Sequence, residues 1–388
     1  MNRDRSYLDH NATSPLRPEV LAATVEALRS VGNPSSVHRE GRAARALVEA
    51  AREKLAALVD ADPDDVVFTS GGTEANATAL RPGALLTPDG RPVLRLITSA
   101  VEHASVLHGH AFPADATVVL PVDRDGRLDP EDLQRALAGS NEPTLVSVQH
   151  ANSETGVVQP VAELARTAHR ARAAFHTDAV QTAGRIPVSA RALGTATLSG
   201  HKLGGPPGIG ALVVPAAGRG PNIQLIGGGG QERRTRAGTE NVAGIVGFGV
   251  AAELAATGRD AEAARLRGLR DRAVAELRRL APAATVFGEG AERLPNTLAF
   301  AVSGVTADTA LIALDLDGVA ASSGSACSSG RVARSHVLAA MGVPDELAPG
   351  ALRLSFGWNS SQEDVTAFAD AFERLTRRLY EQGRARAA

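Results

Sequence analysis

Hydrophobic and polar positions follow two periods along the chain. Leu21, Val25 and Leu28 recur at the spacing of one helix face, as do apolar residues between 47 and 58, and a short apolar run follows at 66–69. Further apolar runs, separated mostly by segments of helix length such as 161–173, lie at 93–98, 117–121, 145–149, 174–178 and 195–199. This alternation predicts an α/β fold with a mostly parallel sheet covered by helices on both faces.

The pattern changes after about residue 260. A long helix is predicted over 261–280, followed by strands over 296–302 and 351–356 with helices between and after them. A chain of 388 residues is long enough for two cores. We therefore expect a large domain over 16–260 and a smaller α/β domain made of 1–15 and 261–388.

Composition narrows the classes of function. The chain has 41 Lys and Arg against 43 Asp and Glu, so no net field attracts nucleic acid or an anionic membrane surface. The N-terminus has no signal-like apolar region and no run of about 18 apolar residues occurs, which favours a soluble, cytoplasmic protein. Aromatic residues make up 3% of the chain, so we expect rings to contribute little to the cores.

A Gly-Gly-Thr turn lies between the predicted strand 66–69 and the next helix. Glycine lets backbone N–H groups approach an anion, and a helix N-terminus adds partial positive charge, so Gly72 and Thr73 form a candidate phosphate site. An N-cap by Thr73 explains this segment equally well.

Two charged residues follow later strands. Asp178 ends the predicted strand 174–178, where a carboxylate could keep the nitrogen of a pyridine cofactor protonated; a helix N-cap is the alternative. Lys202 follows the strand 195–199 in a glycine-rich corner, where partial desolvation would lower the pKa of its amine and suit it to a Schiff base. Most lysines, by contrast, are solvated surface charges.

Two further residues are candidates at strand positions. His103 follows the run 93–98 and could act as an acid or base or stack on a cofactor ring, although a lone histidine is more often structural. Arg353 interrupts an apolar strand and needs an anionic partner, for which a substrate carboxylate or an internal salt bridge would serve.

The only cysteine, Cys327, stands among small polar residues at 322–330. A single cysteine excludes an intrachain disulfide and a cysteine-clustered metal site, and no metal is expected. Structural free cysteines usually lie in apolar pockets, whereas this composition is typical of an exposed loop, so we interpret Cys327 as a reactive thiol. A tolerated surface cysteine is the alternative.

Taken in order, these segments resemble the cysteine desulfurases of the NifS/IscS kind, within the class V aminotransferase family. The resemblance runs from Tyr7 to the last predicted strand. The matching segments are 32–36 with His38, 68–74, 102–103, Asp178 with Gln181, 199–202, 228–232, 236–239, 322–327 and Arg353.

The resemblance implies fold type I of pyridoxal-phosphate enzymes: a large domain with a mostly parallel, seven-stranded type of sheet sandwiched by helices, plus a smaller C-terminal domain. It implies a homodimer with pyridoxal 5'-phosphate as cofactor. The implied contacts are Lys202 as Schiff-base lysine, Asp178 at the pyridine nitrogen, Gln181 at the phenolic oxygen, His103 on the ring, Gly72, Thr73, Ser199 and His201 at the phosphate, and Thr239 from the partner subunit.

The implied reaction removes sulfur from L-cysteine and gives L-alanine and a persulfide on Cys327. Lys202 would remove the α-proton, His103 could serve as an acid, and Arg353 would bind the substrate carboxylate. The persulfide would pass to a sulfur-acceptor protein, such as an iron–sulfur scaffold or a tRNA-thiolation protein. The chain ends soon after its last predicted helix, so we expect no longer tail for docking a scaffold.

One segment departs from the family pattern. The motif His-x-Asn-Asn-Glu-x-Gly has Ser153 in place of the second Asn, which in the family touches the cofactor and the substrate carboxylate. A hydroxyl is shorter and donates one hydrogen bond, so Asn152 or water would replace the contact, or the substrate would be held less firmly. Asn152 and Ser153 are both candidate cofactor contacts.

Rival functions stay open. A selenocysteine lyase, or a class V aminotransferase in which Cys327 is incidental, would share the fold and the cofactor. A non-catalytic sulfur-relay or assembly partner is the rival of another class, and Ser153 is the one feature that favours it.

Overall fold

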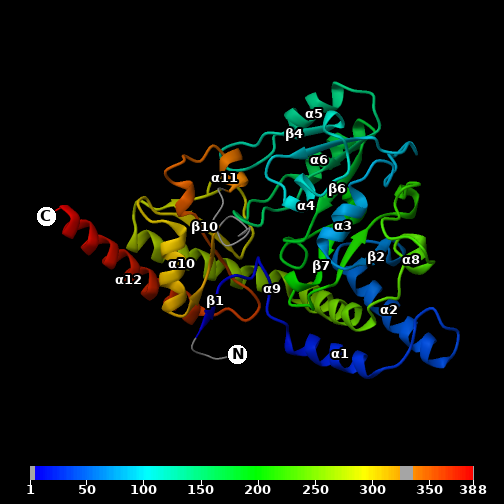
Figure 1. Ribbon diagram of the computed structural model, residues 1–388, viewed down its shortest axis with the longest axis horizontal. Helices are drawn as coiled ribbons and strands as arrows, with labels where there is room; N and C mark the ends of the chain where they lie inside the picture. The colour runs from blue at the N-terminus through cyan, green and yellow to red at the C-terminus, as the bar shows by residue number, and fades with distance from the viewer. Residues whose placement is uncertain (1–4, 324–334, 388) are drawn as a thin grey trace.

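The computed structural model describes residues 5–323 and 335–387 (Figure 1). Cys327 lies outside the described residues, so its predicted role is not located.

A seven-stranded sheet forms the larger part of the molecule, in the order β2-β8-β7-β6-β5-β3-β4. The pairs that join β4, β3, β5, β6 and β7 are parallel, whereas β8 is antiparallel to both β2 and β7. The mostly parallel sheet is therefore confirmed. The strands are β2 (Val66–Thr69), β3 (Arg95–Ser99), β4 (Thr117–Leu120), β5 (Thr144–Ser147), β6 (Ala174–Asp178), β7 (Thr195–Ser199) and β8 (Gly210–Val213).

Helices cover both faces of this sheet (Figure 1). Helix α2 (Arg39–Leu58) and the first part of α9 (Val242–Leu280) pack on one face through Val48, Leu55 and Phe248. Helix α3 (Gly72–Ala79) packs on the other face through Ala75 and Ala79. The remaining helices of this part are α1 (Pro18–Arg29), α4 (Ala104–Leu107), α5 (Pro130–Ala138), α6 (Val161–Arg170), α7 (Ala190–Leu193) and α8 (Gln231–Arg234).

A second core lies around a smaller antiparallel sheet in the order β12-β13-β10-β9, beside the parallel pair β1-β11. The strands are β1 (Ser6–Tyr7), β9 (Thr285–Val286), β10 (Thr297–Ala301), β11 (Val319–Ala320), β12 (Ser322–Ser323) and β13 (Leu352–Ser355). The helices are α10 (Ala307–Leu316), α11 (His336–Ala340) and α12 (Gln362–Ala387).

Aromatic rings contribute more to the second core than the composition suggested. Phe300, Phe368 and Phe372 are fully buried with ring centroids 5.5–6.1 Å apart, and Phe356 belongs to the same cluster. The expectation that rings contribute little is therefore wrong for this core, because the few aromatic residues are concentrated there.

Helix α9 passes from the first core to the second. Ala255 belongs to the first core, whereas Leu266 belongs to the second, and the helix runs through the intervening residues without a break. The predicted helix 261–280 is thus only its second half. By length and composition α9 could cross a membrane, but half of its most apolar window is buried and it packs against α1 and α2, as a core helix does. The domain division at residue 260 stays a prediction.

Candidate active site

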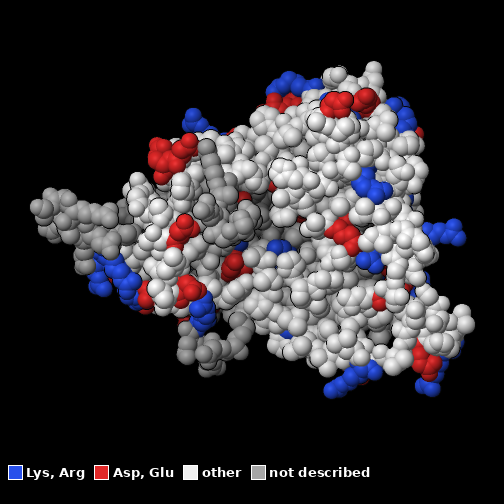
Figure 2. Space-filling model, in the orientation of Figure 1, with Lys and Arg blue, Asp and Glu red and all other residues white. Residues whose placement is uncertain are grey.

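The predicted cofactor residues lie after neighbouring parallel strands of the large sheet. His103 follows β3, Asp178 ends β6, and Ser199 ends β7 three residues before Lys202. Because parallel strands place their carboxyl ends at the same edge of a sheet, these side chains lie at one edge. On the face shown in Figure 2, acidic and basic side chains are scattered and form no large patch of one sign.

Lys202 lies in a short 3-10 turn, Gly200–Lys202, with its amine turned toward the N-terminal segment. Nζ donates hydrogen bonds of 2.7 Å to the backbone oxygens of both Asn11 and Ala12. Burial, and after it the positive charges of Arg185 and Arg353, lower the pKa of the amine to about 8. A substantial fraction of Lys202 is therefore a neutral, nucleophilic amine near neutral pH.

Asp178 is buried and held by two donors. The backbone N–H of Val180 donates to Oδ1 over 3.0 Å, and Nδ2 of Asn76, on α3, donates to Oδ2 over 2.8 Å. Oδ1 accepts from the N–H two residues on, as the side chain of an N-cap does, but the chain after it forms turns and not a helix. Two hydrogen bonds fix the direction of the carboxylate.

Asn76 links Asp178 to His103. Its Nδ2 also donates to Oγ of Ser105 over 2.9 Å, and this hydroxyl lies 2.8 Å from Nδ1 of His103. The backbone N–H of Ser105 donates to the same Nδ1, so His103 caps α4. With Nδ1 accepting, the neutral imidazole carries its proton on Nε2. The structural and the functional interpretation of His103 are thus compatible.

The Gly-Gly-Thr turn opens α3 without a side-chain cap. The helix begins at Gly72 and its N-cap is Gly71, so the alternative of an N-cap by Thr73 is wrong. A Cβ placed on Gly72 would come 3.0 Å from Cγ2 of Val180 and 3.6 Å from Cβ of Ser199, so the turn packs against the end of β7. Uncapped N–H groups beside Ser199 form a cradle suited to a phosphate.

Gln181 and Lys202 meet at one acceptor. Nε2 of Gln181 donates over 3.1 Å to the same Asn11 oxygen that Lys202 contacts. Nδ1 of His201 lies 3.1 Å from Oγ1 of Thr13, and burial lowers the pKa of His201 to about 4. The segment 11–13 therefore orders three of the predicted residues.

Arg353 joins the second core to this edge. Its side chain is 8% exposed; Nη2 forms an ion pair of 2.5 Å with Asp9, and Nη1 donates over 3.0 Å to the backbone oxygen of Ser153. The internal salt bridge is therefore present. The buried Nε has no hydrogen-bond partner among the described residues, which leaves one donor for a further anion.

The side chain of Asn152 makes its hydrogen bonds within the protein. Its Oδ1 accepts from the backbone N–H groups of Glu154 and Thr155, and its Nδ2 donates to the oxygen of Val101. These contacts do not support Asn152 as a replacement for the missing family Asn. Ser153 contributes its backbone oxygen to Asn11 and Arg353, and a role for its hydroxyl stays a prediction.

Thr239 lines a cavity of about 140 Å³ together with Thr69, Ser70 and Arg236 of the same chain. Its predicted contact across a dimer stays a prediction. In the parts of the chain that the structure describes, no group of three or more His, Cys, Asp or Glu side chains is placed to hold a metal ion.

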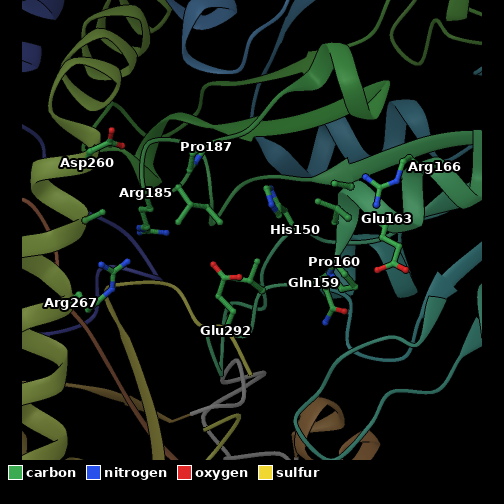
Figure 3. A pocket seen from close by; sticks show the side chains of 15 residues that line it. His150, Gln159, Pro160, Glu163, Arg166, Arg185, Pro187, Asp260, Arg267 and Glu292 are labelled. Atoms are coloured by element: carbon green, nitrogen blue, oxygen red, sulfur yellow. The ribbon is translucent and has the colours of Figure 1, made fainter. Parts of the chain in front are cut away.

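A larger cavity of about 630 Å³ lies between α6 and α9 (Figure 3). Its walls include Asp260 and Arg267 of α9, Glu163 of α6, and His150 and Arg185 from the sheet side. Lys202, Asp178 and His103 are not in its walls, whereas Arg185, which contacts Gln181 of the cofactor edge, is.

Sequence reasoning missed Asn11, Asn76 and Arg185, which hold the predicted residues in place. Asn76 lies one helical turn after Gly72, on the helix that the glycine turn begins, and this spacing is the only sequence signal for it. Arg185 lies one helical turn after Gln181, but the chain there forms turns, so no periodicity marks it.

Comparisons with known proteins cover the whole of this region. Residues 6–368 match the family described as Aminotransferase class-V. A Dictyoglomus turgidum protein described as cysteine desulfurase IscS is 44% identical over 381 residues, covering 96% of this chain and 95% of that one. A cysteine desulfurase of Cereibacter sphaeroides is 45% identical over 370 residues, 93% of each chain. The X-ray structure of a NifS-like protein from Rickettsia africae superposes with a TM-score of 0.85 at 35% identity, covering 97% of this chain and 99% of that one.

Proposed function

Because the chain belongs to the aminotransferase class-V family and is a cysteine desulfurase of the NifS/IscS kind, we propose that Lys202 and Cys327 are its two principal reactive groups. The proposed reaction converts L-cysteine to L-alanine and leaves the sulfur as a persulfide on Cys327. One observation carries the proposal: the amine of Lys202 is half-buried, donates to two backbone oxygens among the described residues and has a pKa lowered to about 8.

The residues of the edge fit pyridoxal 5'-phosphate. The uncapped N-terminus of α3 at Gly72 and Thr73, with Ser199 and His201, would bind the phosphate, since N–H and hydroxyl donors meet there. Asp178, oriented by two donors, would bind the pyridine nitrogen. Further contacts would come from Gln181 to the phenolic oxygen, His103 to the ring, and the amine of Lys202 to the aldehyde carbon. When bound, this cofactor supplies an electron sink for charge at the substrate α carbon.

The chain's own residues would position the substrate and move its protons. Nε of Arg353 is a buried donor with no partner among the described residues, so it would bind the cysteine carboxylate, with Asp9 holding the guanidinium in place. Nζ of Lys202 would take the α-proton, and Nε2–H of His103 is a candidate to return a proton to the product.

The sulfur step balances with a single thiol. The thiolate of Cys327 would attack the substrate sulfur, so that one S–S bond forms and the Cβ–S bond of cysteine breaks. The products are alanine and a Cys327 persulfide. No external oxidant is needed, because the carbon skeleton accepts the electron pair and a proton.

Two substitutions test the proposal. Cys327→Ala should keep the yellow, cofactor-bound protein but lose sulfide release, because the attacking thiol is gone. Lys202→Ala should lose both the covalent adduct and turnover, whereas Lys54→Ala, which removes a half-buried lysine paired with Glu253 away from the site, should keep both. Mass spectrometry after treatment with cysteine should find one added sulfur on Cys327.

Unchanged desulfurase activity in Cys327→Ala would disprove the role of that residue. Assays with selenocysteine, and with an amino-acid and keto-acid pair, distinguish a lyase or an aminotransferase by product. A purified protein that makes no alanine at all would instead indicate a non-catalytic sulfur-relay partner.

We also propose a cytoplasmic homodimer in which Thr239 reaches the phosphate of the partner subunit's cofactor. The exposed apolar stripe on α1, Leu21, Val25 and Leu28, supports a second subunit. The sulfur acceptor would be a separate protein, such as an iron–sulfur scaffold or a tRNA-thiolation protein.

A further inference from the structure

Arg185 is a buried arginine beside the cofactor edge that the proposed chemistry does not use. It is 9% exposed, and its Nη1 donates to the backbone oxygen and to Oε1 of Gln181, both over 2.7 Å. Its Nη2 lies 3.5 Å from the backbone oxygens of His10 and Lys202. Arg185 therefore contacts two of the proposed cofactor residues at once.

The charge of Arg185 is not compensated nearby. Among the described residues, its hydrogen-bond acceptors are carbonyl and amide oxygens, and no carboxylate pairs with it. Asp260 and Glu292 share the wall of the larger cavity with Arg185 without an ion pair to it (Figure 3). Buried arginines are normally paired, so this absence needs an explanation.

Arg185 determines which way the amide of Gln181 points. A guanidinium has donors only, so the atom of Gln181 that faces it must be Oε1. Nε2 then faces Asn11 and the edge where the phenolic oxygen of the cofactor would lie. A glutamine turned the other way would present an acceptor to that oxygen and repel it.

Arg185 also acts on Lys202 through space. The charged groups around Lys202 are Arg185 and Arg353, which favour the neutral amine, and Asp178 and Asp9, which favour the ammonium. The pKa of Arg185 itself is lowered to about 10 by burial, so the residue stays positive at neutral pH.

We infer that Arg185 is a positioning residue: its unpaired charge favours the neutral amine of Lys202, and its hydrogen bonds fix Gln181 with Nε2 toward the cofactor. This role rests on the proposed function, because it concerns how the same site receives its cofactor. The hydrogen bonds from Arg185 to Gln181 and to the backbone oxygens of His10 and Lys202 offset part of the cost of burying a guanidinium without a carboxylate partner.

The chain allows the charge effect to be measured without cofactor or turnover. Lys54 and Lys202 are the lysines of the sequence. Trace acetylation of the cofactor-free protein with acetic anhydride over a pH series, followed by peptide mass spectrometry, gives the titration midpoint of Lys202. Lys54 of α2, which pairs with Glu253 of α9, is the internal reference: its labelling shows how much reagent reacted and whether the fold is intact.

Three variants separate the two roles. Arg185→Gln removes the charge, so the Lys202 midpoint should rise by about one pH unit from its wild-type value near 8. Arg185→Lys keeps the positive charge but loses the guanidinium that hydrogen-bonds to Gln181. The titration midpoint of Lys202 should therefore stay unchanged, while the affinity for pyridoxal phosphate should fall about tenfold. Arg267→Gln removes an exposed arginine from the same cavity and should change neither quantity.

A wild-type midpoint in folded Arg185→Gln would overturn the electrostatic role, and wild-type cofactor affinity in Arg185→Lys would overturn the orientation of Gln181. Arg185→Met is the second charge-free variant if Arg185→Gln does not fold, as judged by Lys54 labelling and thermal unfolding. The outcome is independent of turnover: a raised midpoint together with no alanine production would contradict the proposed function but not the effect of Arg185 on Lys202.

Discussion

Glu102 is a fully buried carboxyl group next to His103. It accepts hydrogen bonds from Oγ of Ser99 and from the backbone N–H of Gln149. Burial raises its pKa from 4.5 to about 8. The folded protein therefore holds this proton more tightly than the unfolded chain, so the stabilisation is complete below about pH 4.5 and is lost as the pH rises toward 8.

Glu102→Gln should remove this pH dependence, because an amide does not titrate. Between about pH 5 and pH 8 the free energy of unfolding of the wild type should fall by a few kcal/mol relative to the variant. Urea denaturation of both proteins at the two pH values measures the difference. Glu163→Gln, at an exposed site on α6, is the control, and an equal wild-type-to-variant difference at both pH values would show that Glu102 is ionised throughout.

Asn76 is the donor that ties Asp178 to Ser105 and His103. Asn76→Ala leaves Oδ2 of Asp178 without this donor, so we expect the affinity for pyridoxal phosphate to fall about tenfold. Titration of the cofactor-free protein by absorbance measures it. Asn222→Ala removes an exposed amide that donates to the Pro82 oxygen and should bind normally; equal affinities in both variants would exclude the role of Asn76.

At the scale of residues, the sequence predicts the reactive side chains at strand ends but not the residues that hydrogen-bond to them. Asp178 and Lys202 could be found because the first ends a buried strand and the second lies three residues after one, where α/β sheets carry their ligands. Asn11 and Arg185 could not, because their contacts cross from segments far apart in the chain and no local pattern encodes them. The dual role of Arg353 likewise appears only when Asp9 is folded beside it.

At the scale of elements, α1 and α9 show where periodicity fails. Helix α1 exists as predicted, but Leu21, Val25 and Leu28 are 39–70% exposed, and Val20 and Ala27 form its buried face. The first half of α9 was not predicted, because a helix buried on several sides has no polar face and so lacks the 3.6-residue pattern. The predicted strands were located to within about two residues because most of their positions are apolar or buried, whereas β8 and the two-residue strands β1, β9, β11 and β12 were not predicted.

Two glycines of α9 provide a matched test of its packing. A Cβ on Gly249 would lie 2.8 Å from Cα of Ala51, so this glycine lets α2 approach α9 closely, whereas a Cβ on Gly258 meets nothing within 4 Å. Gly249→Ala should therefore lower the free energy of unfolding by about 1–3 kcal/mol. Gly258→Ala should raise it by about 0.5–1 kcal/mol through helix propensity. Thermal or urea unfolding measures both, and stabilisation by both substitutions would contradict the close contact.

At the scale of the whole molecule, the exposed apolar stripe on α1 is a candidate contact surface for a second subunit. Leu28 is 70% exposed and Leu21 is 51% exposed on one face of the helix. If this stripe lies in the proposed homodimer, Leu28→Glu should shift the protein toward monomers, because it places a charge in an apolar contact. Sedimentation velocity measures the shift. Glu26→Gln, on the same helix, should leave the dimer intact, and a dimeric Leu28→Glu protein would place the interface elsewhere.

Helix α9 is continuous, and its two halves pack in different cores. Swinging one core away from the other would require this 39-residue helix to bend sharply, which breaks backbone hydrogen bonds that no proline or bulge has weakened. We therefore expect the edge that holds Lys202 and the strand that carries Arg353 to keep their separation when a substrate binds, because both cores are attached to the same unbroken helix.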